Sequence, residues 1–246
     1  MRLMSKNILI TGVSRGLGLA IARAVVAAGW TVYGVSRATS PEFAALAAAA
    51  PGRVKFCAFD LADADGVEKA VFGPEFAGLQ VPLDGFVNNA ATAYDDLVSN
   101  LDLARLQAMY AVNVFAPMMA TRQFVRNALL HGKGASIVHV SSISAHTGYK
   151  GLAMYASTKG ALEAFSKNTA REWGARGIRS NCVVAGFMET AMSGALDEEQ
   201  RQRIHARTAL KAPASLESVA ATVVFLLGEG AASITGQNLF VDSGTI

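Results

Sequence analysis

The chain has 246 residues, of which 52% are hydrophobic and 17% are charged, with a formal net charge of +3. This composition excludes a disordered protein, and the scattered positive charge argues against nucleic-acid binding. No run of about 18 uncharged apolar residues predicts a membrane span, no signal peptide is visible, and Cys57 and Cys182 form no CxxC motif, so we expect a soluble cytoplasmic protein.

Short apolar runs alternate with longer helical patterns along the whole chain. The runs are apolar throughout, which is typical of strands covered on both faces of a parallel sheet. We expect strands at Asn7–Thr11, Thr31–Ser36, Val54–Phe59, Gly85–Asn88, Ala135–Ser141, Ile178–Val184 and Asn238–Val241. The clearest helical patterns cover Leu17–Ala28, Pro41–Ala49, Tyr155–Ala175 and Leu216–Leu227.

This alternation predicts an α/β fold in which a Rossmann-type, doubly wound sheet of about seven parallel strands carries helices on both faces. No repeat, linker or charge block divides the sequence, so we expect a single domain over residues 1–246. Sheets of this kind bind ligands beyond the carboxyl ends of their strands. The motifs described next fall at those ends.

A glycine-rich turn follows the first predicted strand and opens the first predicted helix. Its sequence is Thr11-Gly12-Val13-Ser14-Arg15-Gly16-Leu17-Gly18. Glycines let a pyrophosphate approach the backbone, and the helix N-terminus offers free N–H groups. The spacing GxxxGxG differs from the common GxGxxG pattern. Its place directly after the first strand nevertheless predicts a dinucleotide site rather than an ordinary turn.

The glycine turn and the motifs after it resemble the short-chain dehydrogenase/reductase family over essentially the whole chain. These motifs are Asn88-Asn89-Ala90-Ala91, Asn113, Ser142, Tyr155-x-x-x-Lys159 and Ile234-Thr235-Gly236-Gln237. Two positions depart from the family pattern, since Ala91 replaces a glycine and Ala185 replaces a proline. Neither change removes a reacting group, but both bear on cofactor affinity and on the geometry of the adjacent loop.

The resemblance implies a nicotinamide cofactor, and the end of the second predicted strand indicates which one. NAD is held by an acidic residue about 20 residues past the glycines. Ser36 stands there, followed by Arg37, and guanidinium groups suit a 2′-phosphate, so we expect NADP(H). The alternative is that Arg15 and Arg37 are solvated surface residues. The implied cofactor residues are Gly12, Ser14, Arg15, Gly16, Leu17, Gly18, Ser36, Arg37, Asp60, Leu61, Asn89, Ala90, Ala91, Tyr155, Lys159, Gly186, Met188 and Thr190.

Tyr155 and Lys159 are four residues apart, which places both side chains on one face of a helix. An ammonium favours a neighbouring phenolate, so we expect Lys159 to lower the pKa of Tyr155. The resemblance implies that Tyr155 donates a proton to a carbonyl oxygen, that Ser142 orients this oxygen, and that Asn113 holds a water behind Lys159. The candidate substrate residues are Ser142, Tyr155, Phe187 and His146. His146 is a candidate because it follows the end of the strand that carries Ser142, and the alternative is an ordinary loop histidine.

The region around the sixth predicted strand resembles the 3-oxoacyl-acyl-carrier-protein reductases. The resemblance covers Ser166–Gly177, Gly186–Met192 and Leu196–Arg201. It implies reduction of a 3-oxoacyl thioester, as in fatty acid biosynthesis, and a carrier protein held by Lys133 and Arg176 beside the active-site mouth, although both could be ordinary surface charges. Residues 187–212 mix apolar with polar side chains, so we expect a mobile substrate lid.

Two other functions stay open. One is an NADP(H)-dependent dehydrogenase or reductase of another alcohol or ketone, such as a sugar or a secondary-metabolite intermediate. The other is a non-catalytic NADP(H)-binding scaffold, against which the complete set of Asn113, Ser142, Tyr155 and Lys159 argues. The four histidines, His131, His139, His146 and His205, share no metal-ligand spacing, so we expect no metal.

The assembly expectation also comes from the resemblance, because related enzymes are usually tetramers. Leu101–Leu130 carries more apolar side chains than one buried face requires. They include Met109, Phe115, Met118, Met119 and Phe124. We therefore expect a homotetramer with this segment at a subunit interface, the alternative being that both faces pack within one subunit.

Overall fold

The computed structural model describes residues 5–190 and 197–246 and contains one seven-stranded sheet in the order β3-β2-β1-β4-β5-β6-β7. All neighbouring strands are parallel. The strands are β1 Asn7–Thr11, β2 Thr31–Ser36, β3 Val54–Ala58, β4 Gly85–Asn88, β5 Ala135–Ser142, β6 Ile178–Ala185 and β7 Asn238–Val241. The winding direction reverses between β1 and β4, which confirms the predicted doubly wound, Rossmann-type sheet.

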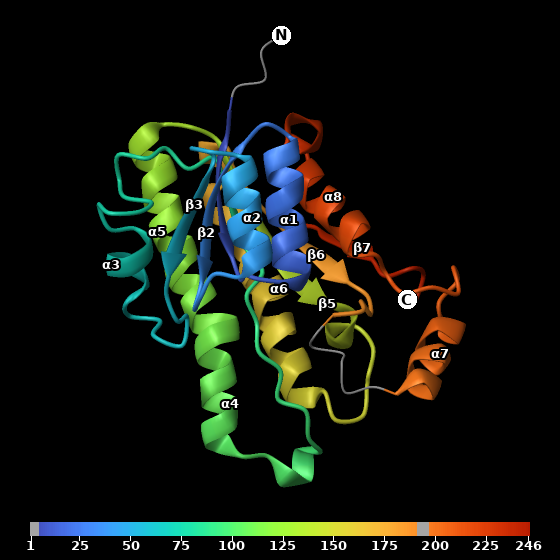
Figure 1. Ribbon diagram of the computed structural model, residues 1–246. Helices are drawn as coiled ribbons and strands as arrows, with labels where there is room; N and C mark the ends of the chain where they lie inside the picture. The colour runs from blue at the N-terminus through green and yellow to red at the C-terminus, as the bar shows by residue number, and fades with distance from the viewer. Residues whose placement is uncertain (1–4, 191–196) are drawn as a thin grey trace.

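Helices cover both faces of this sheet (Figure 1). On one face lie α1 (Gly16–Ala27), α2 (Pro41–Ala49) and α8 (Leu216–Leu227). On the other lie α3 (Val67–Val71), α5 (Ala116–His131) and α6 (Ala153–Trp173). The peripheral helices are α4 (Leu103–Tyr110) and α7 (Glu198–Arg207), and α7 stands away from the sheet in Figure 1. No helix in the described ranges is long and apolar enough to cross a membrane.

The short helical turns lie at the ends of the main elements. Within residues 5–190 and 197–246, four are 3-10 turns: η1 Val98–Asn100, η3 Ile143–Ala145, η4 Gly174–Arg176 and η6 Glu229–Ala231. The fifth, η2 Ala111–Phe115, is a π-helical turn between α4 and α5. Pro117 follows it and has no N–H to donate, so regular α-helical bonding cannot continue through this point.

The predicted bounds agree closely with these elements, and the differences have local causes. The strand expected to end at Val184 continues to Ala185, which pairs with Ser142 on β5. A proline in place of Ala185 would have lacked a backbone N–H, whereas alanine can continue the strand. The helix expected over Tyr155–Ala175 begins two residues earlier and ends at Trp173, where Gly174 opens a 3-10 turn.

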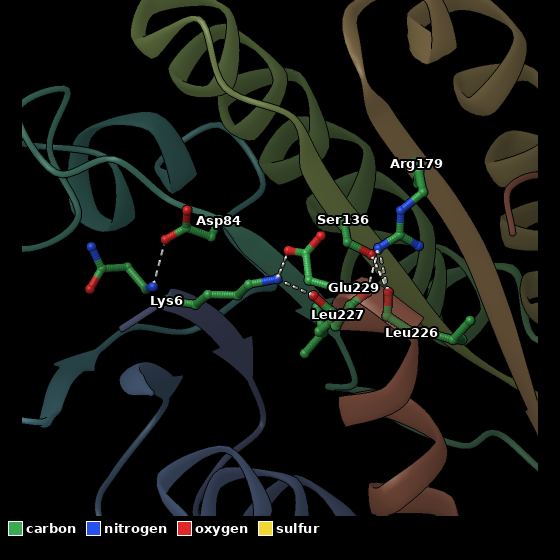
Figure 2. Close-up of polar contacts among 9 residues, drawn as sticks. Lys6, Asp84, Ser136, Arg179, Leu226, Leu227 and Glu229 are labelled. Carbon is green, nitrogen blue, oxygen red and sulfur yellow. Dashed lines mark hydrogen bonds and ion pairs between the residues drawn. The ribbon is translucent and has the colours of Figure 1, made fainter. Parts of the chain in front are cut away.

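The amino edge of the sheet holds the C-terminus of α8 (Figure 2). Lys6 Nζ donates to the Leu227 carbonyl at 3.0 Å, and Arg179 Nη2 donates to the Leu226 carbonyl at 2.8 Å. The Leu226 carbonyl also accepts from Ser136 Oγ at 2.9 Å. Cations at a helix C-terminus are stabilising because they meet the negative end of the helix dipole. These contacts fix one edge of the sheet, and the candidate site lies at the other.

Candidate active site

The glycine turn packs so closely on the loop after β4 that side chains would not fit. Gly12 has φ +76°, and a Cβ on it would lie 2.8 Å from Asn89 Nδ2. A Cβ on Gly18 would lie 2.0 Å from the Gly12 carbonyl oxygen. Arg15 stands at the N-cap of α1 and makes no side-chain cap bond, so the first N–H groups of this helix are left for an anion.

The loop after β4 is bonded directly to the glycine turn. Thr11 Oγ1 accepts from the backbone N–H groups of Asn89 and Ala90, both at 3.1 Å. Asn89 Nδ2 donates to the carbonyls of Thr11 and Gly12 at 3.0 and 3.3 Å. The structure therefore brings two of the predicted cofactor motifs together, with Ala91 next along the same loop.

The end of β2 carries no acidic side chain. Ser36 is buried there, and its Oγ accepts from the Ser14 N–H at 3.2 Å. Arg15 and Arg37 flank this contact and are exposed. After β3, Leu61 is buried and Asp60 Oδ1 accepts from the Ala62 N–H at 3.0 Å within its own loop. The region beside Ser36 is therefore suited to an anionic group, since two cations and no carboxylate adjoin it.

Tyr155 and Lys159 lie one turn apart near the start of α6, as predicted. Lys159 is 3% exposed, its Nζ donates to the Val140 carbonyl on β5 at 2.8 Å, and it lies 5.6 Å from the Tyr155 ring centroid. Burial lowers the pKa of Lys159 to about 8. Burial also raises the pKa of Tyr155 to about 12, and the negative charge of Asp95 acts in the same direction.

The predicted lowering of the Tyr155 pKa is therefore wrong for this arrangement. Burial disfavours the ionised phenol and the charge of Asp95 adds to this effect, while the Lys159 ammonium is bonded to the Val140 carbonyl. A phenol with a raised pKa stays protonated at neutral pH. At neutral pH Tyr155 therefore carries a neutral hydroxyl group, which can donate a hydrogen bond.

Ser142 ends β5, and its hydroxyl oxygen is an acceptor for two local groups. The Ser144 N–H and the Ser144 hydroxyl donate to Ser142 Oγ at 3.2 and 3.0 Å. These bonds use the lone pairs of Ser142 and leave its own proton to donate. The side chain is half-buried, so a carbonyl oxygen can reach it.

Asn113 lies in the π-helical turn and is buried. Its Oδ1 accepts from the Thr92 N–H at 2.8 Å, and its Nδ2 donates to the Thr92 carbonyl at 2.8 Å and to Thr158 Oγ1 at 3.1 Å. Thr158 adjoins Lys159, so the side chain of Asn113 joins the loop after β4 to the turn of α6 that carries Tyr155 and Lys159. Turns of π-helix are frequent at functional sites.

The segment after β6 reaches back toward the glycine turn. A Cβ on Gly186 would lie 2.5 Å from Asp242 Cα, so only glycine fits there. A Cβ on Gly16 would meet the Thr190 side chain at 3.8 Å. Phe187 contacts the His205 ring on α7 with 5.9 Å between centroids. Met188 packs against the core that contains α1 and α8.

His146 and the expected lid are the remaining predicted features on the substrate side of the site. His146 Nε2 lies 2.9 Å from Glu163 Oε2, and its ring packs on Phe240 with 4.8 Å between centroids, so any substrate contact falls to the rest of the ring. Residues 191–196 of the expected lid lie outside the described residues. The remainder of the lid contains α7, which begins with a capping box between Asp197 and Gln200.

Lys133 and Arg176 do not lie beside the active-site mouth of their own chain, contrary to the sequence expectation. Each lies two residues before the start of a strand, Lys133 before β5 and Arg176 before β6, and the Ala135 N–H donates to the Gly177 carbonyl at 3.1 Å. They are therefore neighbours at the amino edge of the sheet. Tyr155 is near the opposite end of α6, whose 21 residues span about 30 Å.

Sequence reasoning missed two buried polar groups behind Lys159. Glu163 is 7% exposed and accepts hydrogen bonds from three segments. Its position one turn after Lys159 on the predicted helix could have indicated that it belongs to the site. His139 on β5 is fully buried between Phe86 and Phe165, with Nδ1 3.4 Å from Asn88 Nδ2. Burial and the positive charge of Lys159 lower the pKa of His139 to about 3.

Comparison with known proteins gives matches along nearly the whole chain. A family model described as enoyl-(acyl carrier protein) reductase matches residues 12–245. Carbonyl reductase (NADPH) 2 of Sus scrofa is 32% identical over 96% of this chain and 94% of that protein. The 3-oxoacyl-(acyl-carrier-protein) reductase of Aquifex aeolicus is 32% identical over 99% and 98%. A gluconate 5-dehydrogenase of Burkholderia cenocepacia, solved with NADP and tartrate, has a TM-score of 0.92 at 26% identity, covering 99% and 96% of the two chains.

A doubly wound sheet with a glycine turn at its switch point, and with a half-buried tyrosine and a buried lysine beside it, defines an oxidoreductase of the dinucleotide-binding class. The family match and the two relatives assign the family within this class. The chain belongs to the short-chain dehydrogenase/reductase family. Its members act on alcohol and carbonyl groups, in agreement with a site built from a phenol, a hydroxyl and an ammonium.

Proposed function

We propose that this chain is an NADPH-dependent reductase of a carbonyl compound, with Asn113, Ser142, Tyr155 and Lys159 as its catalytic residues. The observation that carries the proposal is the arrangement of Ser142 and Tyr155. One ends β5 with a free proton, the other is a protonated phenol on α6, and the Lys159–Val140 bond ties these two elements together. A non-catalytic scaffold would need none of these features.

The cofactor residues named from the sequence fit NADP(H). Gly12 and Gly18 leave the glycine turn free of side chains, and the open N-terminus of α1 suits a pyrophosphate. Arg15 and Arg37 are the cations proposed to bind a 2′-phosphate, and Ser36 offers no carboxylate to repel it. The NADP bound to the gluconate 5-dehydrogenase, a protein of the same fold, supports this choice.

The chain's own groups provide the polar part of the reaction. The reduced nicotinamide supplies the hydride. Tyr155 donates its proton to the carbonyl oxygen of the substrate, and Ser142 donates a hydrogen bond to the same oxygen as negative charge develops there. Lys159 lies behind Tyr155 and holds a proton below pH about 8.

Asn113 is proposed to hold the water that resupplies this proton. Pro117 offers no N–H to the Asn113 carbonyl four residues before it, so that carbonyl lacks its usual helical donor. The side chain of Asn113 is meanwhile used by Thr92 and Thr158, which leaves the carbonyl as the group suited to a water.

The first substrate candidate is a 3-oxoacyl thioester. It is supported by the sequence resemblance around β6 and by the reductase of Aquifex aeolicus. If Lys133 and Arg176 hold an acidic carrier protein, they do so about 30 Å from the Tyr155 of their own chain. The carrier would then serve the active site of a second copy, which makes an oligomer part of this proposal.

The second candidate is a ketone or hydroxy acid that carries no carrier protein. The position of Lys133 and Arg176 at the far edge of the sheet favours this second candidate, because a substrate that is not attached to a carrier protein needs no docking site for one. Carbonyl reductase (NADPH) 2 and the gluconate 5-dehydrogenase with bound tartrate are similar proteins that match this alternative.

Turnover of NADPH with a defined substrate panel distinguishes the two. We expect absorbance at 340 nm to fall with acetoacetyl thioesters of coenzyme A or of acyl carrier protein. Activity only with free ketones or 5-keto sugar acids would select the second candidate, and activity with crotonyl thioester alone would replace carbonyl by enoyl reduction. NADPH binding without turnover of any substrate would overturn the proposal in favour of a scaffold.

The expected lid over 187–212 is retained as part of the proposal. His205 on α7 contacts the Phe187 ring and lies 3.9 Å from Glu189 Oε1, so α7 is linked to the segment that leaves β6. Movement of α7 would therefore carry Phe187 toward or away from the substrate side of Ser142. Limited proteolysis within α7 that slows when NADPH and substrate are added would support a lid.

A homotetramer is also retained as a proposal, although fewer of the apolar side chains of Leu101–Leu130 are left for an interface than the sequence suggested. Met109 and Phe124 are buried within the chain and belong to its core. Phe115 is 51% exposed, and Leu103 and Leu130 are each 63% exposed along the same segment. Burial of these side chains on a second copy would remove apolar surface from water. Light scattering that gives a monomer at micromolar concentration would contradict it.

A further inference from the structure

Glu163 lies on the catalytic face of α6, although nothing in the proposed reaction uses it. It follows Lys159 by one turn and Tyr155 by two, so the three side chains share one side of the helix. It is 7% exposed. A buried carboxylate is costly unless it is hydrogen-bonded and paired with a positive charge. Its retention at this position therefore needs a specific reason.

Three donors from three segments meet the Glu163 carboxylate. The Ser141 hydroxyl on β5 donates to Oε1 in a very short bond. His146 Nε2, in the loop after β5, lies 3.0 Å from Oε1. Asn238 Nδ2, at the start of β7, donates to Oε2 at 2.6 Å. The carboxylate thus joins α6 to β5, to the loop after β5 and to β7.

The bond to Ser141 and the bond from Lys159 to Val140 act as a pair. Val140 and Ser141 are consecutive on β5, and Lys159 and Glu163 are one turn apart on α6. Two contacts at successive positions prevent the helix from sliding or rotating against the strand. Ser142 is the next residue of β5, so these contacts set the place of the Tyr155 phenol relative to the Ser142 hydroxyl.

Glu163 also acts on the charge of Lys159. The groups that face this ammonium are Tyr155 and Glu163 on α6, His139 on β5 and Cys182 on β6. Burial lowers the pKa of Lys159, while the charges of Cys182 and Glu163 oppose that shift. Burial raises the pKa of Cys182 to about 12, so this thiol is uncharged near pH 8 and Glu163 is the group whose charge acts on Lys159 there. His139 and Tyr155 are uncharged at neutral pH, because burial lowers the pKa of one and raises that of the other.

We propose that Glu163 is a positioning residue of the active site, which fixes Tyr155 against Ser142 through Ser141 and keeps Lys159 protonated through its negative charge. The inference rests on the proposed function for the meaning of this geometry. Glu163 lies two turns from the reacting phenol, and it acts on that phenol through Lys159 and β5.

The first test is Glu163→Gln, which keeps the size of the side chain and removes its charge. Its matched control is Glu172→Gln, the same change at an exposed position of α6. We expect the alkaline limb of kcat/KM against pH to move by about one unit toward lower pH in Glu163→Gln. The control should keep the native limb. A merely structural carboxylate would lower activity at every pH without moving the limb, and that result overturns the charge role.

The second test is Ser141→Ala, which cuts the bond to β5 and leaves the carboxylate in place. This small change is expected to fold. We expect kcat to fall at least about fivefold while the alkaline limb stays where it is, because the phenol and the Ser142 hydroxyl lose their fixed spacing. An unchanged kcat in Ser141→Ala would overturn the positioning role.

NADPH binding gives a readout that does not depend on a carbonyl substrate. Its dissociation constant, measured by fluorescence between pH 6 and 10, should rise as Lys159 loses its proton, and in Glu163→Gln the rise should begin about one pH unit lower. If the native protein binds NADPH but reduces nothing, the proposed function fails while this comparison still tests Glu163. Coincident binding curves for native protein and Glu163→Gln would overturn the charge role in that case too.

Discussion

Lys159 Nζ donates a 2.8 Å hydrogen bond to the carbonyl oxygen of Val140, so the helix that carries Tyr155 is bonded to the strand that ends in Ser142. An ammonium that bonds to a buried carbonyl cannot move freely toward the phenol. This bond holds the ammonium in place, 5.6 Å from the Tyr155 ring centroid. This relationship determines what can be expected from changes at each position.

Removal of the Tyr155 hydroxyl should stop turnover and spare the cofactor site. In Tyr155→Phe the ring stays in place, so NADPH should bind with a dissociation constant within about threefold of native, while kcat falls by at least about 100-fold. Steady-state oxidation of NADPH and fluorescence titration measure the two effects. Residual turnover within tenfold of native would show that another group donates the proton.

The rate of carbonyl reduction should fall in alkaline solution because Lys159 has a pKa of about 8. Below this pH the ammonium is present, and above it the charge is lost, while Tyr155 with a pKa of about 12 stays protonated throughout. We expect kcat/KM to be level from pH 6 to about 7.5 and then to fall about tenfold per unit. A level profile up to pH 9.5 would exclude Lys159 as the titrating group.

A carboxylate at the end of β2 should change the cofactor preference. Ser36→Asp places a negative charge where Ser36 now accepts from the Ser14 N–H, and this charge would repel a 2′-phosphate. We expect kcat/KM for NADPH to fall at least about tenfold and that for NADH to rise. Arg37→Ala is the companion variant, which should weaken NADPH alone. Equal effects on both cofactors would contradict the 2′-phosphate assignment.

Two glycines make a matched pair of substitutions. A Cβ on Gly18 would lie 2.0 Å from the Gly12 carbonyl oxygen, so Gly18→Ala must displace the turn and should raise the NADPH dissociation constant at least about tenfold. A Cβ on Gly160, inside α6, meets nothing within 4 Å. Gly160→Ala should stabilise the protein by roughly 0.5–1 kcal/mol. Fluorescence titration with NADPH measures the first effect and urea unfolding the second, and an unchanged NADPH dissociation constant in Gly18→Ala would contradict the close approach at Gly18.

His139 should make the folded protein sensitive to mild acid. Its pKa is about 3 in the folded chain against 6.5 for the ordinary side chain, so between these values the unfolded state binds more protons and unfolding becomes easier as the pH falls. From pH 7 to pH 5 this amounts to about 2 kcal/mol. His139→Asn removes the titrating ring and should flatten that part of the stability curve, as measured by urea unfolding at both pH values. An unchanged slope would assign the acid sensitivity to other groups.

Much of the fold follows from local patterns in the sequence. The bounds predicted from continuous apolar runs such as Gly85–Asn88 agree with the strands of the structure, because a strand buried on both faces carries apolar side chains along its length. The helix over Pro41–Ala49 was predictable from Ser40, whose Oγ accepts from the Phe43 N–H at 3.1 Å, followed by proline at the first position. The direction of the parallel strands could also have indicated that Lys133 and Arg176 lie at the amino edge of the sheet, because both residues precede strands.

The sequence by itself determined the order of strands and helices, the glycine turn and the four-residue spacing of Tyr155 and Lys159, because these depend on neighbours along the chain. Only the tertiary structure decided the direction in which the Tyr155 pKa shifts, the hydrogen bond between Glu163 and Ser141, and the pairing of His139 with Asn88. Each of these depends on which groups are removed from water and which charges then lie near them. Burial brings together residues from separate elements, and no spacing in the sequence measures it.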